Sequence, residues 1–230
     1  MAVGGTITQR ITDLIGSEHT TTATYSTDLI NAAMNEIADM LSVEELLKYS
    51  RTPGVLESNS EWLVEGRKIL QVTRIDADSN GVERVCDEAG RAKFEVASDS
   101  ASIYKATVFS PIYHQDTSNA GAATLKIIPE PTTPQKGKIW YFNYVADGTN
   151  TIAMTETILN NTYYMPGTLI HAIALKSCLN ILNAYLGEQV QEEEDVEMMQ
   201  MIQNQMQGLE KAFLQEMQRF TEKAAEVKGE

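Results

Sequence analysis

The hydrophobic residues follow two different periods in different parts of the chain. Near both ends they recur every three or four residues, which is typical of amphipathic helices. Between residue 56 and about residue 147 the period changes, and apolar residues tend to alternate with polar ones, which is typical of strands. The pattern therefore indicates the α+β class: a helical bundle, built from N-terminal helices and a long C-terminal helical hairpin, with an inserted antiparallel β module.

The N-terminal part is predicted to contain two helices. The first spans residues 7–15, where isoleucine and leucine recur at helical spacing before Gly16. The second begins near Ser26 or Thr27, whose side chains suit an N-cap, and its apolar stripe continues to Leu47. Pro53 and Gly54 are expected to end this part of the chain.

The C-terminal part is predicted to form a helical hairpin. Pro166 suits the first turn of a helix, and the segment from Leu169 to Leu186 is apolar on most of its circumference. Such a helix is expected to be buried on nearly all sides, and its polar interruptions argue against a membrane span. Gly187 is a candidate C-cap residue.

The second helix of this hairpin carries a single apolar stripe with coiled-coil-like spacing. The stripe consists of Met199, Ile202, Met206, Leu209, Phe213, Met217 and Phe220. Two interpretations stay open: the stripe packs within its own domain, or part of it packs against a neighbouring subunit or partner. These seven residues are therefore the candidate interface residues.

The middle of the chain is predicted to form six or seven antiparallel strands. Apolar and β-branched residues favour strands at 68–75, 82–86, 94–96, 102–109, 124–128 and 138–145. Asn80 and Gly81 separate the first two segments and predict a tight hairpin turn. The expected domains are residues 1–52 (N-terminal helices), 53–150 (β module) and 151–230 (a connector and the helical hairpin).

The net charge, the cysteines and the N-terminal residues indicate which partners and which cellular compartment to expect. The 230 residues carry a formal net charge of −14, which disfavours attraction to nucleic-acid phosphates and to anionic membranes. Cys86 and Cys178 are far apart in sequence, so reduced thiols without a disulfide are expected. Residues 1–8 lack the basic and apolar pattern of a secretory signal.

One segment resembles the start of a calcium-binding loop. Asp76, Asp78 and Asn80 have suitable spacing, Gly81 follows them, and Asp87 occupies the twelfth position. The glutamate expected at that position is missing and the flanks read as strands, so a polar hairpin turn without a metal is the favoured interpretation.

No catalytic residue or cofactor site is predicted. The three histidines, His19, His114 and His171, share no metal-ligand spacing, and the chain contains no nucleotide-binding or hydrolase motif. The aromatic run at residues 140–144 suits core packing better than nucleic-acid stacking, which would need more flanking basic residues.

Several segments together resemble the head–tail connector (adaptor or neck) proteins of tailed bacteriophages. They are residues 26–38, 107–113, 125–131 and 137–144, followed by the helix that begins at Pro166. Connector proteins often have an acidic residue after this proline, whereas here Gly167 follows it.

The resemblance implies a structural virion protein without enzymatic activity, located in the neck between capsid and tail. Such proteins form homo-oligomeric rings, commonly dodecamers, that contact the portal protein and tail or neck proteins while DNA passes through without specific binding. Two alternatives stay open: another tail or baseplate component, and a ligand- or calcium-binding β module.

Overall fold

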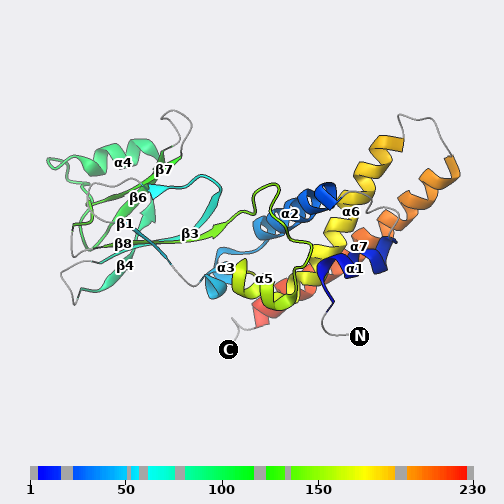
Figure 1. Ribbon diagram of the computed structural model, residues 1–230. Helices are drawn as coiled ribbons and strands as arrows, with labels where there is room; N and C mark the ends of the chain where they lie inside the picture. The colour runs from blue at the N-terminus through cyan, green and yellow to red at the C-terminus, as the bar shows by residue number, and fades with distance from the viewer. Residues whose placement is uncertain are drawn as a thin grey trace. The chain divides into compact units, whose positions relative to one another are not determined.

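The computed structural model describes residues 5–16, 23–50, 53–56, 62–75, 81–116, 123–132, 136–189 and 196–226. It confirms the α+β class, since helices and two sheets occur in one chain. The chain divides into two compact units (Figure 1). The helical unit comprises Met1–Glu45 and Val145–Glu230, and the β unit comprises Leu46–Tyr144. The second boundary lies before the expected residue 150, because residues 145–151 bind to a helix of the helical unit.

The helical unit is organised around α6 (Ile170–Gln189), which packs against α1 (Ile7–Ile15), α2 (Ala23–Met40) and α7 (Val196–Glu226). Figure 1 shows these three helices around α6. Because α6 has apolar residues on nearly every side, only contacts on several faces remove its surface from water. Most of its side chains between Ile170 and Leu182 are buried, as the sequence predicts.

Polar contacts join the helices of this unit at its surface. Lys176 on α6 forms an ion pair with Glu36 on α2, with nitrogen and oxygen 2.7 Å apart. The Gln205 side chain of α7 donates a hydrogen bond to the Leu14 carbonyl of α1 at 3.2 Å. The first contact helps to orient α2 on α6, and the second helps to orient α7 on α1. Both supplement the apolar packing between the helices.

Two short helices lie between residue 155 and α6. α5 (Glu156–Thr162) begins at Thr155, whose hydroxyl accepts a hydrogen bond from the Ile158 backbone. A 3-10 turn, η1 (Gly167–Leu169), then leads into α6. The sequence suggested that Pro166 lies in the first turn of a helix. In the structure it is instead the N-cap of this 3-10 turn.

Three expected helix boundaries are wrong. Helix α2 begins at Ala23, so Ser26 and Thr27, which were expected to cap it, lie inside the helix. The stripe expected to continue to Leu47 is interrupted after α2, and a separate helix, α3 (Val43–Tyr49), follows. The Ser42 hydroxyl accepts a hydrogen bond from the Glu45 backbone, which caps a new helix at this point. At the other end, α6 continues two residues past Gly187, so this glycine is no C-cap.

The β unit contains two four-stranded sheets that share one core. The first has the order β1 (Gly54–Leu56), β8 (Gly137–Asn143), β3 (Arg67–Ile75) and β4 (Glu83–Val85). The second has the order β2 (Trp62–Leu63), β7 (Thr124–Ile128), β6 (Ile112–Asp116) and β5 (Asp87–Glu88). Residues of both sheets form the core, which consists of Leu56, Val64, Val72, Cys86, Leu125, Ile127 and Ile139.

The β unit differs from the predicted antiparallel module in four respects. Its described residues form eight strands instead of six or seven, since β1, β2, β5 and β6 were not predicted. β5 pairs with β6 in parallel, so the second sheet is mixed. Residues 94–96, predicted as a strand, belong to the helix α4 (Arg91–Ser98). Ala97 of this helix forms a small core with Ala89 and Ile112, and Phe94 packs against it. Residues 102–109, also predicted as a strand, form turns stabilised by their own side chains. The predicted segments at 68–75 and 124–128 are strands. The segment predicted at 82–86 is a strand only over Glu83–Val85, and the one predicted at 138–145 ends at Asn143.

Candidate functional site

The loop between α4 and β6 exposes three large apolar side chains. In this apolar loop (residues 99–111), Ile103 is 88% exposed, Tyr104 74% and Phe109 69%. Isolated exposed apolar residues are common on proteins, but several close together mark interaction surfaces. The loop is therefore the strongest candidate for a binding surface within the described residues.

Hydrogen bonds within the apolar loop hold it in one conformation. The Asp99 carboxylate accepts from the Ala101 backbone at 2.9 Å, and the Ser102 hydroxyl accepts from the Tyr104 backbone at 3.1 Å. The Ala106 backbone also donates to the Ala97 carbonyl of α4 at 2.9 Å. These bonds satisfy the backbone locally, so the apolar side chains are free to point outward.

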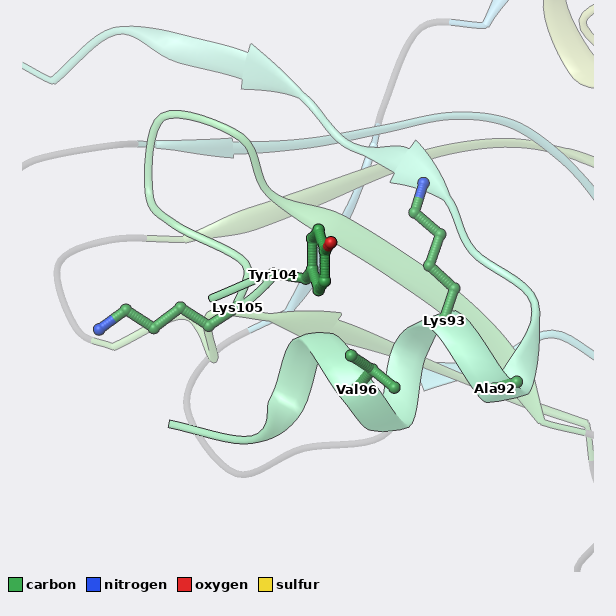
Figure 2. A pocket seen from close by; sticks show the side chains of 5 residues that line it. All are labelled: Ala92, Lys93, Val96, Tyr104 and Lys105. Carbon is green, nitrogen blue, oxygen red and sulfur yellow. The ribbon is translucent and has the colours of Figure 1, made fainter. Parts of the chain in front are cut away.

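A surface pocket of about 530 Å³ lies between α4 and the apolar loop (Figure 2). It is lined by Ala92, Lys93, Val96, Tyr104 and Lys105. Figure 2 shows the Tyr104 ring between Lys93 and Lys105, with Val96 below it on the helix, Ala92 farther along the helix, and the Lys105 side chain extending away from the ring. We call these five residues the α4 pocket.

The helix supplies the pocket because its two faces differ. Ala97 and the half-buried Phe94 pack against Ala89 and Ile112 of the small core under the helix. The side chains of Lys93 and Val96 consequently lie on the outer face. Both pocket lysines are exposed, and among the described residues the side-chain amine of neither forms an ion pair or hydrogen bond. The pocket thus combines an apolar wall with two positive charges.

The exposed apolar surface continues onto the edge strand β4. The guanidinium of Arg84 lies over the Phe109 ring, 5.1 Å from its centre, a typical cation–π distance. Val82 and Val85 on either side of Arg84 are also exposed. The contact joins the apolar loop to β4, so the loop is held at both its ends.

The net negative charge of the chain comes entirely from the helical unit. Residues 46–144 contain 12 acidic and 12 basic residues, so the β unit is neutral. The rest of the chain contains 20 acidic and 6 basic residues, which gives the full −14. The pocket lysines therefore belong to the neutral unit, and the excess of acidic residues belongs to the other.

The predicted interface stripe on α7 is largely core of the helical unit. Ile202, Leu209, Phe213 and Met217 are buried, while Met199, Met206 and Phe220 are half-buried. Since α7 packs against α6, contacts within the chain already use most of the stripe. A role at a neighbouring subunit stays a prediction. Among the α7 residues whose side chains the structure describes, the exposed large apolar ones are Val196, Met201 and Leu214.

The calcium candidate falls mostly outside the described residues. Asp76, Asp78 and Asn80 are among the residues that the structure does not describe, and Asp87 is an exposed residue of β5. The described part of the chain contains no group of three histidine, cysteine, aspartate or glutamate residues suited to a metal ion. His114 is held by a hydrogen-bonding contact with the Ala89 carbonyl at 2.8 Å, and its ring lies 5.2 Å from that of Phe94.

Both thiols are poorly placed for nucleophilic chemistry. Burial raises the pKa of Cys86 to about 12, against a smaller lowering effect of Arg74. Burial also raises the pKa of Cys178 to about 12. Because the thiolate is the reactive form of cysteine, neither side chain is suited to attack a substrate near neutral pH. Both cysteines are free.

The aromatic run on β8 contributes to packing, as the sequence suggests. Phe142 is buried, and its ring meets that of Tyr144 edge to face with centres 5.9 Å apart. Tyr141 packs on the shared core beside Trp62, with ring centres 4.8 Å apart. Arg67 lies over the Trp62 ring, so these aromatic surfaces already have partners.

The segment Gly167–Gly187 is long and apolar enough to cross a membrane by length and composition alone. In the structure it corresponds to η1 and most of α6, whose side chains pack against other helices of the unit. A buried core helix has the same composition, and this packing accounts for it.

Comparison of the chain with protein-family models, curated proteins and solved structures finds no match. Neither the apolar loop nor the α4 pocket was predicted from the sequence. Ile103, Tyr104 and Phe109 were placed in a predicted strand. The serines at positions 100, 102 and 110, together with Asp99 and Pro111, are the signal that favours a loop there.

Proposed function

We propose that this chain is a structural subunit of the head–tail connector of a tailed bacteriophage. In this proposal, copies form a ring between the portal protein and the tail, in the neck of the virion. The helical bundle with its C-terminal hairpin forms the body of the subunit, and the inserted β unit carries contacts to partners. The proposal starts from the sequence resemblance.

The observation that supports it most is the separation of charge from apolar surface. The helical unit carries the whole net charge of −14, whereas the neutral β unit carries the exposed apolar loop. An acidic wall repels phosphates and lets DNA pass without binding. A neutral surface with exposed aromatic and aliphatic residues suits protein contacts.

The ring geometry adds a requirement that this chain can meet. Closed rings with cyclic symmetry need two different surfaces on each subunit, one for each neighbour. The acidic helical unit and the β unit with its apolar loop differ in charge and in exposed residues. The inert thiols agree with a structural role, since they offer no nucleophile.

Electron microscopy of the full chain mixed with the portal protein of the same phage tests the proposal. We expect rings of this protein at one end of the portal, absent from images of portal alone and from a mixture with an unrelated acidic protein. A portal that stays bare at all protein concentrations rejects the connector assignment. Binding to purified tails with a bare portal indicates the alternative, a tail or baseplate component.

A further inference from the structure

We infer that the α4 pocket is the docking site for the acidic helical unit of a second copy of this chain. The inference deepens the proposed function and rests on it, because a ring requires each subunit to contact the next through unlike surfaces. The pocket on the β unit is one of these surfaces, and the helical unit of the neighbouring copy is the other.

The exposed side chains define what the pocket can bind. Val96 and Tyr104 present an apolar wall, and Ile103, which precedes Tyr104 in the chain, is also exposed. Burying such surface is favourable roughly in proportion to its area, so an apolar side chain of the partner is the natural contact for this wall. The Tyr104 ring supplies a large, stiff contact area, a property that makes tyrosine common at interfaces.

The two lysines define the charge of the occupant. Lys93 comes from α4 and Lys105 from the apolar loop, and they lie on opposite sides of the Tyr104 ring (Figure 2). Within the described part of the chain, neither has a carboxylate partner. A partner surface that has carboxylates on either side of an apolar side chain is complementary to this pocket.

The helical unit of another copy has this composition. It contains 20 acidic and 6 basic residues, and some of its exposed apolar residues stand beside acidic ones. At the junction of α2 and α3, for example, Met40 and Val43 are exposed, with Asp39 before the first and Glu44 after the second. The β unit is neutral, so a contact between two β units lacks this complementarity.

Zero-length cross-linking of the full chain identifies the occupant directly. A carbodiimide couples a lysine amine only to a carboxylate in contact with it. In a mixture of unlabelled and isotope-labelled chains, mass spectrometry separates cross-links between copies from those within one copy. We expect Lys93 or Lys105 to be joined to acidic residues of residues 1–45 or 145–230 in a different copy. Cross-links confined to one copy, or joining the lysines only to another β unit, overturn the inference.

Charge-reversal variants provide the second readout, by sedimentation velocity with and without portal. We expect Lys93→Glu and Lys105→Glu each to weaken self-association by about tenfold or more, the size of effect that a hot-spot residue has. Lys48→Glu is the matched control. It makes the same change in net charge at an exposed residue of α3 that belongs to the β unit but does not line the pocket, and we expect self-association to change by less than about twofold.

The outcomes separate this inference from the proposed function. If rings form on the portal and the two pocket variants assemble like the wild type, the pocket inference is wrong and the connector assignment stands. If the variants self-associate normally but no longer bind portal, the occupant is the portal protein and the inference is again wrong. If the wild-type chain neither self-associates nor covers the portal, both fall.

Discussion

The Thr151 hydroxyl donates a hydrogen bond to the side-chain oxygen of Asn31 at 3.0 Å, and both side chains are shielded from solvent. Asn31 lies on α2, and 120 positions separate the two residues in the chain. Asp28 and Asn35, on the same side of α2 by helical spacing, bind the same returning segment. Asp28 accepts from the Gly148 backbone, and Asn35 both donates to and accepts from the Val145 backbone. Helix α2 therefore fixes residues 145–151 where the chain re-enters the helical unit.

Replacing Asn31 with alanine should destabilise the helical unit. The Asn31 amide also donates to the carbonyls of Ala146 and Thr149, so the substitution leaves three groups without their partner. We expect a loss of about 2–4 kcal/mol in the free energy of unfolding, because unpaired buried polar groups are costly. Urea denaturation followed by circular dichroism measures it. Asn204→Ala, at an exposed position of α7, should change stability by less than about 0.5 kcal/mol. Equal stabilities of the two variants contradict the role given to Asn31.

In the β unit, Arg74 is only 2% exposed and holds the loop that follows β7. Its guanidinium donates to the carbonyls of Pro129 at 2.8 Å, Ile75 at 2.8 Å and Glu130 at 3.3 Å. Arg74→Met keeps an apolar stem but removes these donors. We therefore expect the free energy of unfolding, measured by thermal or chemical denaturation, to fall by about 2–4 kcal/mol. Arg91→Met removes an exposed ion pair with Glu95 and should cost less than about 1 kcal/mol. A larger effect of the exposed arginine is the result that rejects this account.

The helical parts follow from the sequence better than the β unit does, for a physical reason. The apolar repeat of residues 7–15 and the all-round apolar helix after Leu169 have one packing solution each, namely burial of those faces. The break at Ser42 was missed because a capping serine looks the same in sequence as a serine on a helix surface. The Asn31 contacts were missed because their partners are backbone groups of a segment more than 100 residues away.

The candidate site was missed for a different reason. Ile103, Tyr104 and Phe109 are residue types that favour strands, yet all three are exposed in turns. Propensity describes a residue in an average environment, whereas these side chains are held outward by local hydrogen bonds. In the same way Phe94 suggested a strand, but it anchors one face of α4 to the small core. A single sequence does not distinguish an apolar residue that is buried in the core from one that is exposed on the surface.

Gly167 should tolerate no side chain. A Cβ added there would lie 2.8 Å from the carbonyl oxygen of Glu156, a backbone atom of α5. Because that atom moves only with its helix, we expect Gly167→Ala to lower the free energy of unfolding by about 1–3 kcal/mol. Gly208→Ala is the matched control, since α7 leaves open space around it. It should stabilise the chain by about 0.5–1 kcal/mol through helix propensity. Equal shifts in melting temperature for the two variants refute the steric argument.

Glu83 should make the stability of the β unit depend on pH in the acid range. Burial raises the pKa of its carboxyl, but hydrogen bonds from Lys138 and Thr73 outweigh this effect and hold the pKa below 4.5. A carboxyl whose pKa is lower in the folded state stabilises the fold above its unfolded pKa and loses this contribution as the pH falls through the folded pKa.

The stability difference between wild type and Glu83→Gln should therefore be largest near neutral pH and shrink as the pH falls below about 4.5. Lys138→Met removes a hydrogen-bond donor and should weaken the same pH dependence. Denaturant titrations at a series of pH values measure both. A difference that grows on acidification has the wrong sign and rejects the assignment.

Two neighbouring residues of α7 distinguish packing within the subunit from packing between subunits. Phe213 belongs to the predicted interface stripe but is buried in the single chain, whereas Leu214 is 53% exposed. Phe213→Ala should cost about 3–5 kcal/mol in the free energy of unfolding of dilute protein, because it leaves a cavity in the core. Leu214→Ala should cost less than about 0.5 kcal/mol under the same conditions. If Phe213→Ala instead leaves the dilute chain as stable as the wild type and weakens only its self-association, the stripe acts mainly between subunits. In that case contacts on α7, and not the α4 pocket alone, hold neighbouring copies together.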